Sequence, residues 1–319
     1  MRARVVTQLL AKLGGLALTL FLSSIVIFSA LLLTPGDPVA TLAGGKRPTP
    51  EMIAAIREQF HLDDPIWLQY LRWLGNVVTG NLGDSFVYKA PVAEVIGPRI
   101  GVTVALVAYA IVLIAIFGIG SGILAATRGP GADRAVLLST SIGMAMPTFV
   151  VAILLIWVFA KSLGWFPVYG AGTGFFDQLH HLTLPAISLT VVYIAYISRI
   201  TRGALVGQLG AEHVDTARVR GIPRSRIFRS HVFLNASPQI LAVSGATIAG
   251  LFATSAIAEQ AFGINGLGSL LTDAAARKDL PVVQIISLLL VAVFVVLNAV
   301  VDTVNALIDP DSLKSGRTA

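Results

Sequence analysis

Long apolar runs alternate with short polar segments along this chain, and they predict a bundle of membrane-spanning helices. Six stretches of at least 21 residues contain no Asp, Glu, Lys or Arg: 13–36, 100–127, 135–160, 178–198, 230–258 and 280–301. About 20 apolar residues in helical form cross the hydrocarbon core of a bilayer. The pattern therefore predicts an all-α, polytopic transmembrane helical bundle with six spans.

Composition and charge support this class and orient the chain. The 319 residues are 55% hydrophobic and 13% charged, whereas a soluble domain carries about 25% charged residues. If both termini face the cytoplasm, most of the 23 Lys and Arg fall in inner segments, as expected for a multi-pass protein. The net charge of +6 thus reflects topology, and no nucleic-acid partner is predicted. The chain has no cysteine, which excludes disulfides and thiolate metal sites.

One sizeable segment, 37–99, lies outside the spans and contains two helix starts. Thr49 can cap a helix that has Pro50 at its first position, and Asp64 with Pro65 forms the same capping pattern before residues 66–78. The second helix carries three large aromatic residues, Trp67, Tyr70 and Trp73. We expect them to pack against the spans near the headgroup level, rather than to bind a ligand.

The residues of an enzyme are missing. The five histidines form no HExxH motif, no GxSxG sequence is present, and no Walker A spacing is found. Glu259 lies at the outer end of the fifth predicted span, close enough to water to be tolerated without a role. No catalytic, cofactor or metal site is therefore predicted, and uphill transport would need energy from another subunit.

Small residues and one proline stand out inside the spans. Gly118 and Gly122 have the GxxxG spacing that allows two helices to approach closely, and we expect helix packing there. Pro147 interrupts the third predicted span, and it frees backbone groups that must be satisfied inside the protein. Pro147 and Glu259 are the two candidates for a path or gate.

The most distinctive polar segment is the loop from Arg199 to Arg229, which carries seven Arg and two acids between two charge-free runs. Such a basic loop is expected in the cytoplasm. Glu212 begins a short helix, since an acid in the first turn complements the helix dipole. Gly221 provides the left-handed residue that ends it, followed by Pro223. A surface that binds anionic lipid explains the arginines but not the offsets of Glu, Ala and Gly.

These offsets carry a resemblance. The sequence EHVDTARVRG at 212–221 resembles the EAA loop of ABC-importer permeases of the dipeptide/oligopeptide/nickel class, which commonly reads EYxxTARAKG. His213 replaces the usual tyrosine, and Asp215 replaces a usual basic residue. Further segments match the class in order along almost the whole chain: PGDP at 35–38, GNLG at 80–83, LPA at 184–186, His231 to Pro238, GLG at 266–268, RKDLPVVQ at 277–284 and Asp309-Pro310.

The resemblance implies a type I ABC-importer fold in the cytoplasmic (inner) membrane of a prokaryote. Its partners would be a second permease subunit, two cytosolic ATPases that bind ATP and Mg, an extracytoplasmic solute-binding protein and membrane lipid. The domains would be 1–98, a five-span core 99–308 with the loop 199–235, and a tail 309–319. Residues that couple to the ATPase would be Glu212, His213, Thr216, Ala217, Arg218, Arg220 and Gly221. In that loop Ala217 is small enough to let another protein surface approach.

Three functions remain open at this point. The resemblance implies ATP-driven import of peptides, or of a related cargo such as a nickel chelate. The main alternative is an ATP-independent channel or secondary carrier, although no ionisable pair lies near the middle of a span. A membrane-embedded enzyme is the third, and the missing catalytic residues disfavour it.

Overall fold

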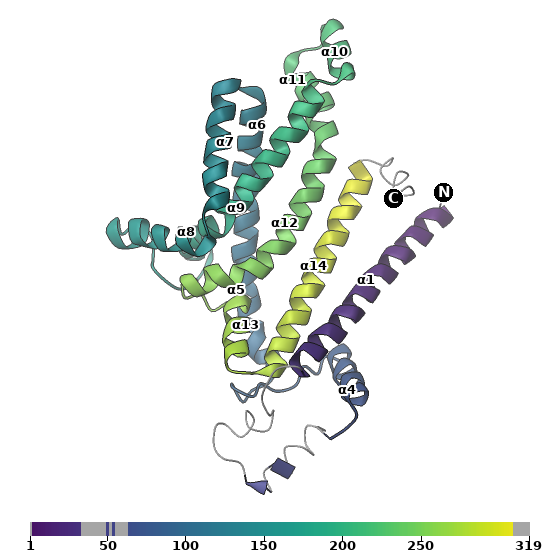
Figure 1. Ribbon diagram of the computed structural model, residues 1–319, viewed down its shortest axis with the longest axis vertical. Coiled ribbons are helices and arrows are strands. Elements are labelled where there is room, and N and C mark those ends of the chain that lie inside the picture. Colours follow the sequence, from purple (N-terminus) through teal and green to yellow (C-terminus); the bar gives the residue numbers. More distant parts are fainter. Residues whose placement is uncertain (1, 33–48, 51–52, 55–62, 309–319) are drawn as a thin grey trace. The chain divides into compact units, whose positions relative to one another are not determined.

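The structure, a computed structural model, describes residues 2–32, 49–50, 53–54 and 63–308 (Figure 1). In these ranges the chain is helical with no strand beyond one antiparallel bridge, which confirms the predicted all-α class. The main helices are α1 (Arg2–Leu32), α4 (Ile66–Val78), α5 (Val92–Leu113), α6 (Gly120–Thr127), α7 (Pro130–Ala145), α8 (Thr148–Leu155), α9 (Phe175–Leu209), α10 (Glu212–Val219), α11 (Arg224–Ile227), α12 (Leu234–Ala261), α13 (Leu267–Ala276) and α14 (Leu280–Ile308). Three π-helical segments continue α5, α8 and α11: η1 (Ile114–Ile119), η2 (Ile156–Ser162) and η3 (Phe228–Phe233).

Several of these helices can cross a membrane. Three are long and apolar enough by themselves: Val92–Thr127, Phe175–Leu209 and Leu280–Val301. Two bent pairs raise the number to five, and α1 contains the shorter apolar stretch Gly14–Ser29. The count of six spans and the orientation of the termini stay predictions. The helix predicted from Thr49 and the tail 309–319 fall largely or wholly outside the described residues.

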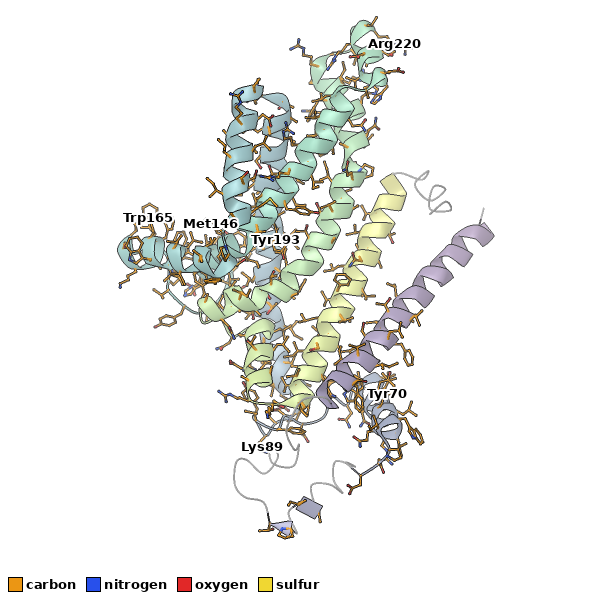
Figure 2. All side chains as sticks on the ribbon, viewed as in Figure 1. Tyr70, Lys89, Met146, Trp165, Tyr193 and Arg220 are labelled. Atoms are coloured by element: carbon orange, nitrogen blue, oxygen red, sulfur yellow. The ribbon has the colours of Figure 1, made fainter. Side chains whose placement is uncertain are left out.

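The third predicted span, 135–160, is not one straight helix. It bends by 100° between α7 and α8. Met146 and Pro147 at the corner have extended backbones, with ψ of 120° and 139°. A proline disfavours helical geometry in the residue before it and cannot donate a backbone hydrogen bond. The carbonyl of Pro147 then accepts from the amides of Val150 and Val151, so α8 starts at once in a new direction (Figure 2, Met146).

The chain forms two compact units, 1–101 with 266–296 and 102–265 with 297–319. In the first unit, α4 packs on α1 through aromatic rings: the centroids of Tyr70 and Trp73 lie 5.5 and 5.6 Å from that of Phe28. Tyr70 also shares a hydrogen bond of 2.8 Å with the hydroxyl of Ser24. The expected packing on a span is thus confirmed for Tyr70 and Trp73, whereas Trp67 is 63% exposed. A second cluster joins the start of α5 to α13 and α14.

In the second unit, α9 is the central helix, and α6, α7, α8 and α12 all pack against it (Figure 1). Gly118 lies against Ile197, where a Cβ atom would approach to 3.2 Å. Gly122 lies still closer, since a Cβ atom there would be 2.7 Å from the carbonyl oxygen of Ser198. The expectation that these two glycines serve helix packing is confirmed.

The predicted loop Arg199–Arg229 starts too early. α9 continues for 35 residues to Leu209, so Arg199 and Arg202 belong to a helix. The guanidinium of Arg199 donates to the hydroxyls of Thr140 (3.2 Å) and Ser141 (2.6 Å) on α7. Arg202 forms a bidentate ion pair with Asp133. These acceptors allow two charges inside a mainly apolar helix, and the polar loop begins only at Gly210.

Candidate functional site between α9 and α12

The helix predicted from Glu212 is confirmed as α10, and its end has a defined geometry. Gly221 has φ of +72°, the left-handed conformation that favours glycine. Its amide donates to the carbonyl of Arg218 (3.0 Å), and the amide of Ile222 donates to the carbonyl of Ala217 (3.2 Å). This pair of bonds is a Schellman motif. Ile222 and Ala217 also belong to one apolar cluster, as that motif commonly requires.

One face of α10 is buried against its own chain. Val214 is completely buried, and Ala217 is 4% exposed. They form an apolar cluster, here called the loop core, whose other buried members are Ala204, Leu205, Ile227, Val232, Ala236 and Ile240. The suggestion that the small side chain of Ala217 faces another protein is therefore wrong. The residue is small because α10 lies close to the ends of α9 and α12.

The opposite face of α10 is exposed to solvent. Glu212, Thr216 and Val219 recur at helical spacing along this outer face, and Arg220 follows at its end (Figure 2). Val219 is 90% exposed, more than any other large apolar residue among the described side chains. Sequence reasoning missed Val219, although its spacing of three from Thr216 was a readable signal. Arg218 forms an ion pair of 2.8 Å with Asp215 at the edge of this face.

A polar contact ties α10 to the start of α12. The side-chain amide of Asn235 donates to the carbonyl of His231 (2.8 Å) and lies 3.2 Å from Nε2 of His213. Nε2 of His213 also lies 3.3 Å from the carbonyl oxygen of His231, so it donates to that carbonyl or accepts from the amide of Asn235, according to the tautomer of the ring. The histidine that replaces the usual tyrosine thus bridges two elements of the loop, and the motif residue Asn235 acquires a role.

The two candidate path residues lie elsewhere in the second unit. Pro147 makes the corner between α7 and α8, and its place in a path or gate stays a prediction. Glu259 differs from expectation: it is completely buried rather than close to water. Its Oε1 accepts a hydrogen bond of 2.7 Å from the hydroxyl of Thr103 on α5. Glu259 lies in the last turn of α12 with its side chain inside the protein, and the charge pattern of the sequence alone did not predict this.

Asp279 is a second buried acid, and the sequence analysis did not predict a structural role for it. It lies in the first unit, directly before α14, and it is also completely buried. Across the ranges that the structure describes, no group of three or more His, Cys, Asp or Glu is placed to hold a metal ion.

Together these features define a class. The chain is a helical membrane protein in which a short, two-faced helix projects between two long apolar helices. Comparison with known families gives the particular family. The family described as binding-protein-dependent transport system inner membrane component matches residues 118–314, and its N-terminal counterpart matches residues 5–107. The chain belongs to this family, and it is a membrane-spanning permease subunit of an ABC importer.

Similar proteins agree over almost the full length. The probable peptide ABC transporter permease protein y4tP of Sinorhizobium fredii is 34% identical over 306 residues, covering 95% of this chain and 97% of the relative. The glutathione transport system permease protein GsiC of Escherichia coli K12 is 34% identical over 300 residues, covering 94% and 96%. The inward-facing MetNI methionine ABC transporter has a chain of similar fold, with a TM-score of 0.56 at 17% identity over 68% of this chain and 97% of that one.

Proposed function

We propose that α10 is the coupling helix of the importer and that its outer face seats in a cytosolic ATPase subunit. The observation that carries the proposal is the division of α10 into two faces. The inner face is buried in the loop core, whereas the outer face leaves Glu212, Thr216 and Val219 exposed for a partner. The apolar side chain of Val219 is held in water at the end of a short helix, and burial against another surface would lower the free energy of the complex.

We infer the rest of the assembly from the properties expected of the family. A second homologous permease subunit would complete the path, two ATPases would bind ATP and Mg below the membrane, and an extracytoplasmic solute-binding protein would deliver the cargo. This chain would bind no nucleotide itself. The location would be the inner membrane of a prokaryote, with both termini and the loop between α9 and α12 in the cytoplasm.

The cargo that we propose is a peptide. Support comes from the relatives, which are a probable peptide permease and a glutathione permease, and glutathione is itself a short peptide. Selection among peptides would rest with the solute-binding protein. A nickel chelate would be transported by the same mechanism.

Co-purification of the tagged chain with its ATPase subunits tests the docking assignment. Full burial of a valine stabilises a complex by about 1.5–3 kcal/mol, so Val219→Asp should reduce ATPase recovery by tenfold or more. Glu212→Lys should also weaken assembly, because the outer face then changes its charge. Arg224→Glu is the matched control, since Arg224 is also exposed but lies beyond the end of α10.

Two results would overturn the proposal. Recovery of the ATPase at the wild-type level with both Val219→Asp and Glu212→Lys would remove α10 from the interface. Concentrative uptake by the chain alone, in vesicles without nucleotide, would favour a secondary carrier instead.

A further inference from the structure

One cationic surface has no role in the proposed contact of α10 with the ATPase. It lies on α11 and η3, which continue into α12 as one helix from Arg224 to Ile248, with α10 beside its start (Figure 1). Arg224, Arg226 and Arg229, here called the arginine face, are all exposed. None of the three forms an ion pair with any residue that the structure describes. Three unpaired cations within six residues therefore face solvent.

No nearby acid neutralises the arginine face. Residues 216–258 contain no Asp or Glu. Asp215 is paired with an arginine of its own helix (2.8 Å), and Asp133 of α7 is paired with an arginine of α9. Glu212, at the start of α10, is exposed and forms no ion pair in the part of the chain that the structure describes. The arginine face thus keeps its positive charge.

The register of η3 aligns this charge with an exposed apolar residue. The backbone bonds of a π-helix join residues five apart, so residues with that spacing share a face. Ile227 and Val232, five apart across η3, are both buried in the loop core. Arg229 and Leu234 have the same spacing, and both are exposed, Leu234 by 55%. One outer face of this helix therefore places a cation directly before an exposed apolar side chain.

The spacing along the helix matches the layers of a membrane surface. Leu234 is the first exposed large apolar residue of this helix, and the five residues from Arg229 to Leu234 rise about 7 Å. A headgroup layer is about 5–8 Å thick, because a bilayer of about 40–45 Å has a hydrocarbon core of about 30 Å. With Leu234 at the edge of the core, Arg229 lies at the depth of the lipid phosphates, and Arg226 lies about one turn above it.

We propose that the arginine face and Leu234 form a binding site for an anionic phospholipid of the cytoplasmic leaflet. Arg226 and Arg229 would hold the phosphate, since a guanidinium binds phosphate oxygens with two parallel hydrogen bonds, and an acyl chain would lie on Leu234. This inference rests on the proposed function, which places this end of the unit in the cytoplasm. An acidic surface of the ATPase is the other anionic partner to consider. It gives no reason, however, for an exposed leucine on the same face at the spacing of a headgroup layer.

The lipid site lies on the back of the segment against which α10 packs. Ile227 and Val232 belong to the same loop core as Val214 and Ala217 of α10. A lipid that holds the outer face of α11 and η3 therefore restricts the movement of the surface on which α10 rests. The coupling of ATP hydrolysis to uptake is expected to rise when anionic lipid is present.

The experiment uses the whole importer, with both permeases and both ATPases. Retention of phosphatidylglycerol by the purified complex is titrated in detergent, and uptake per ATP hydrolysed is measured in vesicles of phosphatidylcholine with increasing phosphatidylglycerol. Arg226→Gln/Arg229→Gln should raise the half-saturating amount of phosphatidylglycerol on the order of tenfold, and it should match the wild type in phosphatidylcholine alone. High salt should weaken the wild-type response, because it screens exposed charges.

Two control variants separate the site from total charge. Arg226→Lys/Arg229→Lys keeps both charges and should keep most of the lipid response. Arg128→Gln/Arg134→Gln removes the same charge from exposed positions around the turn between α6 and α7, and it should respond to phosphatidylglycerol as the wild type does. An equal loss in the Arg128 and Arg134 variant would show that net charge acts, and this would overturn the site.

The remaining outcomes are distinguishable. Wild-type retention of phosphatidylglycerol by Arg226→Gln/Arg229→Gln overturns the inference. Recovery of coupling in phosphatidylcholine vesicles on addition of inorganic phosphate would assign the face to a soluble anion instead. Lower ATPase recovery from detergent with the same variant would assign the face to the ATPase. A wild-type complex without an ATPase would overturn the proposed function itself, whereas lipid retention by the permease would still decide the lipid site.

Discussion

Replacement of Gly221 by valine isolates the backbone geometry of the loop between α9 and α12 from its packing. A Cβ atom at this position would meet no atom within 4 Å, so steric crowding contributes nothing. The cost is conformational: φ of +72° costs an L-residue about 1–2 kcal/mol, and a β-branched side chain falls at the upper end. Since 1.4 kcal/mol is a factor of ten, the equilibrium shifts about tenfold or more against the Schellman end of α10.

The expected result is uncoupling with an intact membrane domain. In reconstituted importer, Gly221→Val should lower peptide uptake per ATP hydrolysed, while yield and thermal stability in detergent change little. Gly221→Asn is the matched control, because asparagine tolerates the left-handed conformation and should retain most of the coupling. Wild-type uptake and wild-type coupling ratio in Gly221→Val would refute the reasoning, because the strained helix end would then have no mechanical consequence.

Three further predictions concern the membrane helices. Gly122→Ala should destabilise the protein by about 2 kcal/mol, because overpacking costs about 1–3 kcal/mol and the better helix propensity of alanine offsets at most about 1 kcal/mol of this. Thermal unfolding in detergent should show a lower midpoint. Gly120→Ala is the control, because a Cβ atom there meets open space and the midpoint should stay unchanged or rise. Glu259→Leu removes a buried acceptor and should cost about 1–3 kcal/mol, whereas Glu259→Gln can still accept that hydrogen bond; equal thermal midpoints would contradict this role. Asp133→Ala and Arg202→Ala should each lower the thermal midpoint, and a double-mutant cycle should give less than additive loss if the ion pair acts as a unit.

Features with local causes could be predicted from the sequence. The start of α10 at Glu212 and its end before Gly221 depend on residues within one helical turn, and both are confirmed. The break at Pro147 was also readable, because proline limits the residue before it. Its angle was not, since 100° depends on how α8 packs against α9 and α12.

Features with distant causes could not be predicted. In the sequence, Arg199 and Arg202 follow an apolar run, and two charges at that place predict that the membrane helix ends before them. Their partners lie 59 residues (Thr140) and 69 residues (Asp133) earlier in the chain, on a helix that only the fold brings alongside. The burial of Glu259 has the same origin, because its donor Thr103 is 156 residues away. Hydropathy measures the preference of a side chain for water, but it does not show whether a charged side chain is paired in the fold.

The placement of the loop core explains how a push on α10 could reach the membrane helices. Val214 belongs to the same apolar cluster as Leu205 near the end of α9 and Ala236 at the start of α12, so the loop core joins the inner face of α10 to both helices. These two helices are also joined deeper in the unit, where the hydroxyls of Tyr193 and Thr254 lie 3.1 Å apart. Close-packed interiors transmit displacement because they cannot be compressed. A movement of α10 would therefore shift α9 and α12 together, rather than bend one of them, and this favours rigid-body rocking if α10 is the coupling helix that we propose.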